Sequence, residues 1–284
     1  MRYRFIRFPE GRAKAVTFSY DDGCPEDIRF ADLLADYGLK CTFNFNCNAM
    51  KKEPLTKEQV EEHMLSKGHE IAVHGENHRA LGMVRAIDGI RDVLDCRLEL
   101  EDRYDMIIRG MAYPDSGITR FANEASYENV KRYLADLGIV YSRTLGGDND
   151  KFDLPCDWHA WMPTAHHDNP AIYEYIDKFL EIDMDIARSV GRRPRLFYLW
   201  GHSYEFERKN NWDHIERICE KLAHKDDIWY ATNIEIYNYV TAYNSLVYSA
   251  DGTRVYNPTL VKVWFDVDKK LYSIEPGKTI KIEE

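Results

Sequence analysis

One stretch near the N-terminus sets both the fold and the chemistry: AVTFSYDDG, residues 15–23. Residues 15–20 form a short apolar run of the kind that predicts a buried β-strand. Two adjacent carboxylates, Asp21 and Asp22, follow that strand directly, and Gly23 suits a turn after them. The apolar residues of 28–34 then recur at helical spacing, and Gly38 is placed to end that helix. The first forty residues therefore predict a strand, a polar turn and a helix.

The same strand-and-helix order repeats to about residue 242. Predicted strands cover residues 15–20, 41–46, 70–74, 106–111, 139–144, 196–202 and 228–232. Predicted helices begin at residues 28 and 56 and cover 86–104, 126–137, 171–189, 214–223 and 234–242. Strands that alternate with helices pair in parallel through right-handed crossovers. About seven such units favour a closed or nearly closed (β/α) barrel over a short open sheet.

The pattern changes at the C-terminus. From residue 246 onwards the chain predicts several short strands, and the turn sequences Asp251-Gly252 and Pro276-Gly277 separate them. We therefore expect two parts, a barrel over residues 1–244 and a small β appendage over residues 245–284. About forty residues are few for an independent core.

Composition narrows the range of partners. The 284 residues carry a formal net charge of -10, which disfavours nucleic acid and anionic membranes because phosphate binding relies on clustered Lys and Arg. No segment is apolar enough to span a bilayer, and residues 1–5 lack the apolar core of a secretory signal. We therefore expect a cytoplasmic protein. The six cysteines show no zinc or disulfide spacing and are interpreted mainly as buried free thiols. The sequence does not indicate an oligomeric state.

Polar residues that could take part in catalysis or metal binding follow several of the predicted strands. Asp21 and Asp22 follow the first strand, His74 ends the third, and His202 ends the strand that begins at residue 196. Active sites of βα barrels are built at the carboxyl ends of the strands. We therefore expect these side chains to meet on one face of the barrel.

The residue types indicate a metal site of the zinc kind. Such a metal takes imidazole nitrogen and carboxylate oxygen, and the four-residue spacing of His74 and His78 lets both rings converge. Of the adjacent carboxylates at 21 and 22, one can bind the metal while the other accepts a proton from water. Arg109, at the end of its predicted strand, could keep that base ionised, and His202 could be a general acid.

These stretches resemble the polysaccharide deacetylases of carbohydrate esterase family 4, which share the NodB homology domain. TFSYDDG (17–23) and HGENH (74–78) resemble the first two family motifs, and RGMAYP (109–114) resembles a variant of the third. DW (157–158) and LWGH (199–202) are similar to the fourth and fifth. The resemblance spans about residues 14–235. It implies a distorted (β/α) barrel that removes acetyl groups from a carbohydrate with the help of a divalent metal.

The resemblance also implies a role for each matching residue. Asp22, His74 and His78 would bind the metal, with zinc favoured and cobalt or nickel possible. Asp21 would be the catalytic base, and Arg109 would pair with it and orient it. The substrate would be an acetylated poly- or oligosaccharide, with N-acetyl favoured over O-acetyl.

The remaining motif residues would surround the reacting acetyl group. The backbone N–H of Tyr113 would help to form the oxyanion hole. His202 would be the acid, with Asp157 as its orienting partner. Trp158 would form a wall of the site, and Trp200 would also contact substrate.

The sequence departs from the family pattern in two places. Position 75 is Gly where the family usually has a Ser or Thr that steadies the metal loop, and the third motif is stretched around residues 110–112. A group of polar residues has no counterpart in the motifs and is interpreted as loop or substrate-contacting residues: His159, His166, His167 and Asp168.

Three other functions are compatible with parts of this pattern. The chain could hydrolyse another small amide on the same scaffold. It could be a non-catalytic carbohydrate-binding protein, although a pure binder needs neither acid nor base. Two His and one carboxylate also form the site of non-haem iron oxygenases, but the βα pattern opposes their antiparallel scaffold.

Overall fold

A single sheet of eight parallel strands forms the centre of the structure, a computed structural model that describes residues 2–52, 55–145, 147–184 and 191–283. The strands are β2 (Lys14–Asp22), β3 (Cys41–Phe45), β4 (Glu70–Val73), β5 (Gly110–Ala112), β6 (Tyr141–Arg143), β7 (Ala165–His166), β8 (Arg195–Gly201) and β9 (Ile228–Tyr230). Their order across the sheet is β6-β5-β4-β3-β2-β8-β7, and β9 also pairs with β2. All these pairs are parallel, as the alternating pattern predicts.

The sheet curls until its two edges nearly meet. Residues 161–164 bridge the gap between β6 and β8 without forming a regular strand. The N–H of Trp161 donates to the carbonyl of Ser142 on β6 (3.1 Å), and the N–H of Thr164 donates to the carbonyl of Tyr198 on β8 (2.7 Å). The predicted distorted (β/α) barrel is confirmed.

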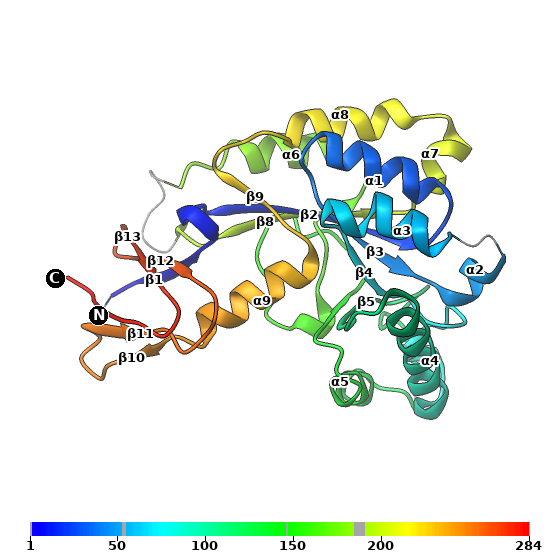
Figure 1. The fold of residues 1–284 in the computed structure, drawn as a ribbon, viewed down its shortest axis with the longest axis horizontal. Coiled ribbons are helices and arrows are strands. Elements are labelled where there is room, and N and C mark those ends of the chain that lie inside the picture. The colour runs from blue at the N-terminus through cyan, green and yellow to red at the C-terminus, as the bar shows by residue number, and fades with distance from the viewer. Residues whose placement is uncertain (1, 53–54, 146, 185–190, 284) are drawn as a thin grey trace.

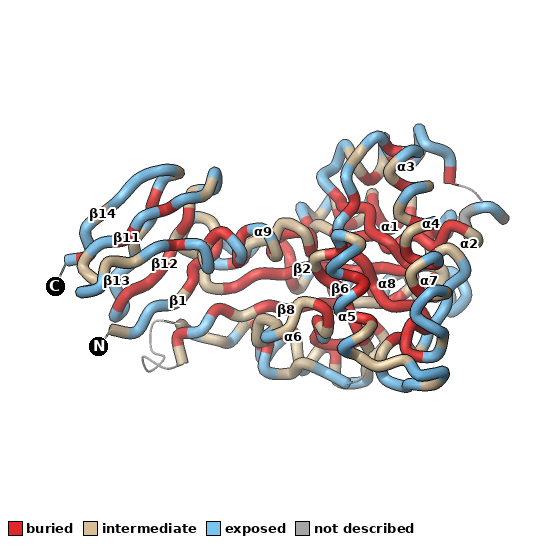
Figure 2. The backbone as a smooth tube through the Cα atoms, turned by 90° about the horizontal axis from the view of Figure 1, so that it is seen from below, coloured by how far each residue is buried: buried red, intermediate tan, exposed pale blue. Residues whose placement is uncertain are grey.

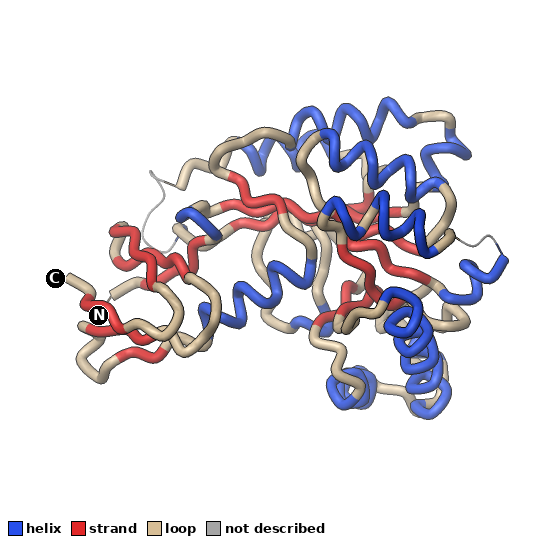
Figure 3. Tube along the Cα trace, in the orientation of Figure 1, coloured by secondary structure: helices blue, strands red, loops and turns tan. Residues whose placement is uncertain are grey.

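Helices pack around this sheet, with α1, α3, α6 and α8 along one side and α4 and α5 beside β4 and β5 (Figure 1). Figure 3 shows the strands of the central sheet between the helices, whereas the strands near both termini lie outside them. The helices are α1 (Glu26–Asp36), α2 (Cys47–Lys52), α3 (Lys57–His63), α4 (Ala86–Tyr104), α5 (Tyr127–Asp136), α6 (Ile172–Leu180), α7 (Tyr204–Lys209), α8 (Trp212–Leu222) and α9 (Asn233–Asn244). Short 3-10 helices are η1 (Pro9–Gly11), η2 (Leu65–Lys67), η3 (Leu81–Met83) and η4 (Trp158–Ala160).

The core lies on both faces of the central strands. Figure 2 shows β2 and β8 as buried along most of their length. Phe18 and Phe43 belong to a large cluster that includes apolar residues of α1 and α4, whereas Tyr198 and Trp161 belong to a second cluster with α9. Burial on both faces explains why the strand sequences are continuous apolar runs rather than alternations of apolar and polar residues.

Several predicted elements are shorter in the structure, and two of them differ most. The strand predicted at 106–111 is only Gly110–Ala112, so residues 106–109 precede it. The helix predicted at 171–189 is Ile172–Leu180, and the last part of that prediction, residues 185–189, lies outside the described residues. The capping box predicted at the start of α3 is present, with Thr56 and Gln59 bonded to each other's backbone.

The C-terminal strands form two small antiparallel sheets. One contains β10 (Val247–Tyr248), β11 (Arg254–Tyr256) and β14 (Thr279–Lys281), and the other contains β1 (Arg4–Arg7), β12 (Val263–Val267) and β13 (Lys270–Ile274). The first strand of the chain thus pairs with the appendage, and Figure 1 shows both termini there. The boundary at residues 244 and 245 stays a prediction.

Two general expectations can be compared with the structure directly. All six cysteines are free; four are buried, Cys24 is partly exposed and Cys156 is exposed. In the part of the chain that the structure describes, no helix is both long and apolar enough to cross a membrane.

Candidate active site

The predicted site residues of the first, second and fifth motifs meet at one edge of the barrel. Asp21 and Asp22 end β2, His74 follows β4, and His202 follows β8. In the sheet, β3 lies between β4 and β2, and β8 flanks β2 on the other side. The carboxyl ends of these parallel strands therefore bring residues far apart in sequence to one place.

Three side chains form a candidate metal centre. The Nε2 atoms of His74 and His78 lie 3.7 Å and 3.6 Å from Oδ1 of Asp22. His74 is buried, and its Nδ1 lies 3.0 Å from the carbonyl oxygen of Ala112. When Nδ1 donates its proton to that carbonyl, Nε2 is left to bind a metal. Two imidazoles and a carboxylate fit a divalent cation of the zinc type with positions left for water and substrate.

The loop that carries both histidines is held by helix α4. Asp92 of α4 accepts a hydrogen bond from the N–H of Asn77 at Oδ1 (2.7 Å), and its carbonyl accepts one from Glu76 (2.9 Å). Gly75 has φ +79°, and a Cβ there would lie 2.3 Å from Oδ2 of Asp92. Asp92 thus occupies the space that a Ser or Thr at position 75 would need. Sequence reasoning missed Asp92, although an acidic residue on the buried face of a predicted helix was a signal.

Asp21 is a buried carboxylate with two polar partners. Nη2 of Arg143 donates to its Oδ2, and Nδ2 of Asn44 donates to its Oδ1 (2.9 Å). Burial by itself would raise the pKa of Asp21, but Arg143, His74 and His202 outweigh it and hold that pKa below its ordinary value. Asp21 is therefore ionised and able to accept a proton.

Arg109 does not pair with Asp21, and that prediction was wrong. Arg109 is exposed, and its guanidinium lies 5.9 Å from the ring centroid of Tyr237. Because β5 begins at residue 110, Arg109 stands at the amino end of the strand, away from the site. Arg143 is fully buried at the carboxyl end of β6 and occupies the expected position. Its place at the end of the strand predicted at 139–144 could have suggested it.

His202 lies beside the metal centre. Its Nε2 is 3.9 Å from Oδ2 of Asp22, and its Nδ1 is buried with Oε2 of Glu205 3.9 Å away. Burial would lower the pKa of His202, but Glu205, Asp21 and Asp22 outweigh that effect and raise it. A raised pKa suits a group that must carry a proton near neutral pH.

Asp157 is not the partner of His202, which corrects a second prediction. Oδ2 of Asp157 accepts hydrogen bonds from Tyr127 (2.7 Å) and Lys131 (2.6 Å), and Oδ1 caps the short helix η4 by accepting the N–H of His159 (3.0 Å). These bonds tie the loop after β6 to α5. The carboxylate that faces His202 comes instead from Glu205, three residues later on α7.

Tyr113 is not free to form an oxyanion hole. Its N–H donates to the carbonyl of Arg143 (3.0 Å), which extends the pairing of β5 with β6. Its hydroxyl donates to the carbonyl of His159 (2.8 Å), and the side chain is buried. The expected role of this residue is therefore wrong.

The two tryptophans differ in their surroundings. Trp158 packs edge-to-face on Trp161 and Tyr237, with centroids 4.8 Å and 5.1 Å away, so it belongs to the core near α9 rather than to a wall of the site. Trp200 is half-buried, and the guanidinium of Arg143 lies 4.6 Å from its ring. Its ring centroid is 6.0 Å from that of His202. Trp200 therefore borders the site, and Trp158 does not.

The histidines that match no family motif also differ from one another in their surroundings. His159 is buried, and its Nδ1 lies 3.2 Å from the hydroxyl of Ser142. His166 ends β7 and His167 follows it, and both face Glu205.

Comparison with known proteins supports the resemblance. Residues 9–138 match the family model described as polysaccharide deacetylase. Among curated proteins, none is detectably similar in sequence. The resemblance seen in the motifs is confirmed for the matched residues.

Several solved structures share the fold. A putative polysaccharide deacetylase from Mycobacterium smegmatis is 17% identical, with TM-score 0.57 over 84% of this chain and 94% of its own. The Puue allantoinase is 12% identical, with TM-score 0.57 over 81% and 91%. The D285S mutant of the peptidoglycan deacetylase PdaC from Bacillus subtilis is 14% identical, with TM-score 0.51 over 84% and 96%. At these identities the similarity establishes the fold.

Proposed function

We propose that this chain, whose residues 9–138 match the polysaccharide deacetylase family, is a metal-dependent hydrolase that removes acetyl groups from a poly- or oligosaccharide. N-acetyl groups are favoured over O-acetyl groups, and zinc over cobalt or nickel. The observation that carries the proposal is the arrangement of the Asp22, His74 and His78 cluster beside a buried, ionised Asp21 and a half-buried His202.

The roles follow from position and charge. Asp22, His74 and His78 would hold the cation, which when bound polarises a carbonyl and makes water a stronger nucleophile. Asp21 accepts the proton of the attacking water, since Arg143 keeps it ionised and Asn44 fixes its second oxygen. Removal of such a base typically costs 10²–10⁴-fold in rate, on the order of 3–5 kcal/mol.

His202 supplies a proton to the departing nitrogen or oxygen. Its raised pKa supports this role, because the ring must be protonated when the bond to the sugar breaks. Trp200 borders the same space and presents a partly exposed indole on which a sugar ring can stack. Activity against pH should be bell-shaped, with Asp21 setting the acidic limb and His202 the basic limb.

A second candidate is hydrolysis of a different small amide. The fold matches a putative deacetylase and an allantoinase with equal TM-scores, so the fold does not choose between their substrates. The same acid, base and metal residues would serve either amide. A non-catalytic carbohydrate binder would need neither Asp21 nor His202.

Release of acetate is the decisive measurement. The zinc- or cobalt-loaded protein is incubated with N-acetylated and O-acetylated mono- and oligosaccharides, and acetate is quantified. Asp21→Asn and a chelated sample should abolish release, whereas Asp157→Asn, a carboxylate of the neighbouring loop, should retain it.

Three outcomes separate the candidates. Release that requires Asp21 and metal supports the deacetylase. Release of ammonia or of another acid from a small amide, without acetate from any sugar, supports the second candidate. Sugar binding without any release, in a sample that holds metal, contradicts both and favours a binding protein.

A further inference from the structure

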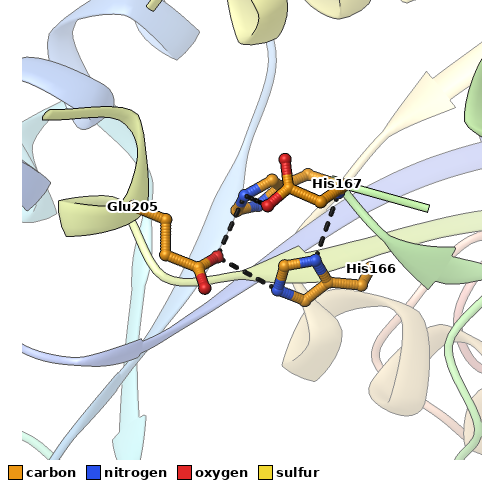
Figure 4. A group of neighbouring side chains, drawn as sticks. His166, His167 and Glu205 are labelled. Atoms are coloured by element: carbon orange, nitrogen blue, oxygen red, sulfur yellow. Dashed lines mark hydrogen bonds and ion pairs between the residues drawn. The ribbon is translucent and has the colours of Figure 1, made fainter. Parts of the chain in front are cut away.

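A second group of potential metal ligands lies beside the candidate site. His166, His167 and Asp168 are consecutive at the end of β7, and Glu205 belongs to the first turn of α7. One ligand atom from each of the four residues lies within 4.8 Å of the others. Figure 4 shows the two imidazoles turned towards the Glu205 carboxylate. None of these residues belongs to the Asp22, His74 and His78 cluster.

Two buried atoms of this group have ion-pair contacts but, among the described residues, no aligned hydrogen bond. Nε2 of His167 lies 3.0 Å from Oε2 of Glu205 and 3.4 Å from Oδ2 of Asp168. His167 is fully buried, yet among the described residues neither its Nε2 nor Oε2 of Glu205 has a hydrogen bond of acceptable geometry. Buried polar atoms almost always have a partner, and an ion is one explanation when the protein supplies none.

The outer hydrogen bonds assign different roles to the two histidines. Nδ1 of His167 lies 3.2 Å from the Tyr20 hydroxyl, and when it donates to that oxygen, Nε2 presents its lone pair. His166 accepts the N–H of Asp168 at Nδ1 (3.1 Å), so in its neutral form the proton is on Nε2. That Nε2 lies 3.1 Å from Oε2 of Glu205. The Nε2–H of His166 thus faces the Glu205 carboxylate without an aligned hydrogen bond, and His167 is the imidazole able to bind a cation.

Two carboxylates and two cationic side chains meet in this group. Asp168 and Glu205 contribute two negative charges. Lys209, which contacts Oδ2 of Asp168, contributes one positive charge, and His202, whose Nδ1 lies 3.9 Å from Glu205, contributes a second when it is protonated. Carboxylates placed this close together are stabilised by pairing with a cation. We infer that His167, Asp168 and Glu205 form a second divalent-cation site, with an imidazole and carboxylate ligand set of the zinc type.

The inferred site lies across His202 from the first one. His202 Nε2 is 3.9 Å from Asp22, a proposed ligand of the first metal, and His202 Nδ1 is 3.9 Å from Glu205. A cation held by Glu205 would fix the start of α7 and the end of β7 against each other. Binding of a cation at this second site does not depend on the reaction that the protein catalyses.

Metal stoichiometry tests the inference without any substrate. The full chain is loaded with zinc, freed of excess metal by dialysis, and analysed for zinc per chain. The wild-type protein should hold two equivalents. Glu205→Gln and Asp22→Asn should each hold one, and the double variant none. Glu207→Gln is the matched control, since Glu207 is an exposed carboxylate on the same helix, and it should hold two.

The outcomes are distinguishable from one another. One equivalent in the wild-type protein, lost in Asp22→Asn and kept in Glu205→Gln, would overturn the inference. So would a second equivalent that survives Glu205→Gln but disappears in Glu99→Gln, because Cys47, Glu76 and Glu99 form another group of potential ligands. Asp168→Asn provides an independent variant, and circular dichroism confirms that each variant is folded. Absence of acetate release would affect the proposed function and leave this result unchanged.

Discussion

The pair between Arg143 and Asp21 can be tested by removing its cation. In Arg143→Met, a side chain of similar length keeps much of the packing while Oδ2 of Asp21 loses its charged partner. Both side chains are almost wholly buried, with relative exposures of 0% and 3%. The matched control is Arg109→Met, which removes an exposed arginine from the amino end of β5.

The loss of unfolding free energy expected for Arg143→Met follows from the burial of the ion pair. Two unit charges 4 Å apart attract each other by about 4 kcal/mol at an effective dielectric constant of about 20. Breaking a buried pair by removing one partner typically costs about 3–5 kcal/mol, because the remaining charge is left without compensation. We therefore expect Arg143→Met to lower the free energy of unfolding by about 3–5 kcal/mol at neutral pH, and Arg109→Met by less than about 0.5 kcal/mol.

The pH dependence supplies a more specific signature. In the wild-type protein the pKa of Asp21 is lowered, so its stabilising contribution is present above the unfolded pKa and is lost as pH falls through the folded pKa. Without Arg143, burial dominates and Asp21 is expected to favour its protonated form. The stability difference between the two proteins should therefore begin to shrink above about pH 4, the ordinary range of an aspartate, where Asp21 of the variant takes up its proton. It should shrink further as pH falls through the lowered pKa of the wild-type Asp21.

Urea unfolding at several pH values, followed by circular dichroism, measures this difference. Asp21→Asn in the Arg143→Met background should recover part of the loss, because it removes the unpaired charge. An Arg143→Met variant as stable as Arg109→Met at neutral pH, with no change of the difference at low pH, would refute the assignment of Arg143 as the cation that holds Asp21 ionised.

Three further predictions concern the metal loop and a buried acid. Gly75→Ser should lower the free energy of unfolding by about 1–3 kcal/mol in urea titrations, since its Cβ would meet Asp92 at a left-handed φ; an unchanged midpoint would contradict this. Asp92→Ala should weaken zinc binding about 10–100-fold in chelator competition, because the loop loses its support; unaltered affinity would count against that role. Burial raises the pKa of Asp27 to about 7, so the stability that Asp27 contributes below its unfolded pKa of about 4 is lost as pH rises to 7. Asp27→Asn should flatten the change in unfolding free energy between pH 4 and 7, and an unaltered slope would exclude Asp27 as its source.

The general plan of the barrel and the centre of the site could be predicted because they depend on local patterns. An apolar run followed by Asp21 and Asp22 specifies a buried strand with carboxylates at its end, whatever its neighbours are. His74 and His78 are four residues apart, so one loop brings both rings together. Parallel pairing then places the carboxyl ends of strands at one edge, which brings His202 beside them.

Partners from distant segments could not be predicted in the same way. Arg109 and Arg143 both adjoin predicted strands, and only the observed start of β5 shows that Arg109 stands at the wrong end. A shift of three or four residues in a strand boundary moves a side chain about 10–13 Å along the barrel, since each residue rises by about 3.3 Å. Tertiary structure decides which arginine meets Asp21.

The barrel class and the Asp22, His74 and His78 cluster follow from the amino-acid sequence, because periodicity and short spacing act within a few residues. The packing of distant segments, by contrast, places Glu205 rather than Asp157 opposite His202 and brings Asp92 to the metal loop. It also leaves the Tyr113 N–H bonded to Arg143. These contacts depend on where residues of long loops lie against the barrel and on which backbone groups are already hydrogen-bonded. Both are set by packing of the whole chain.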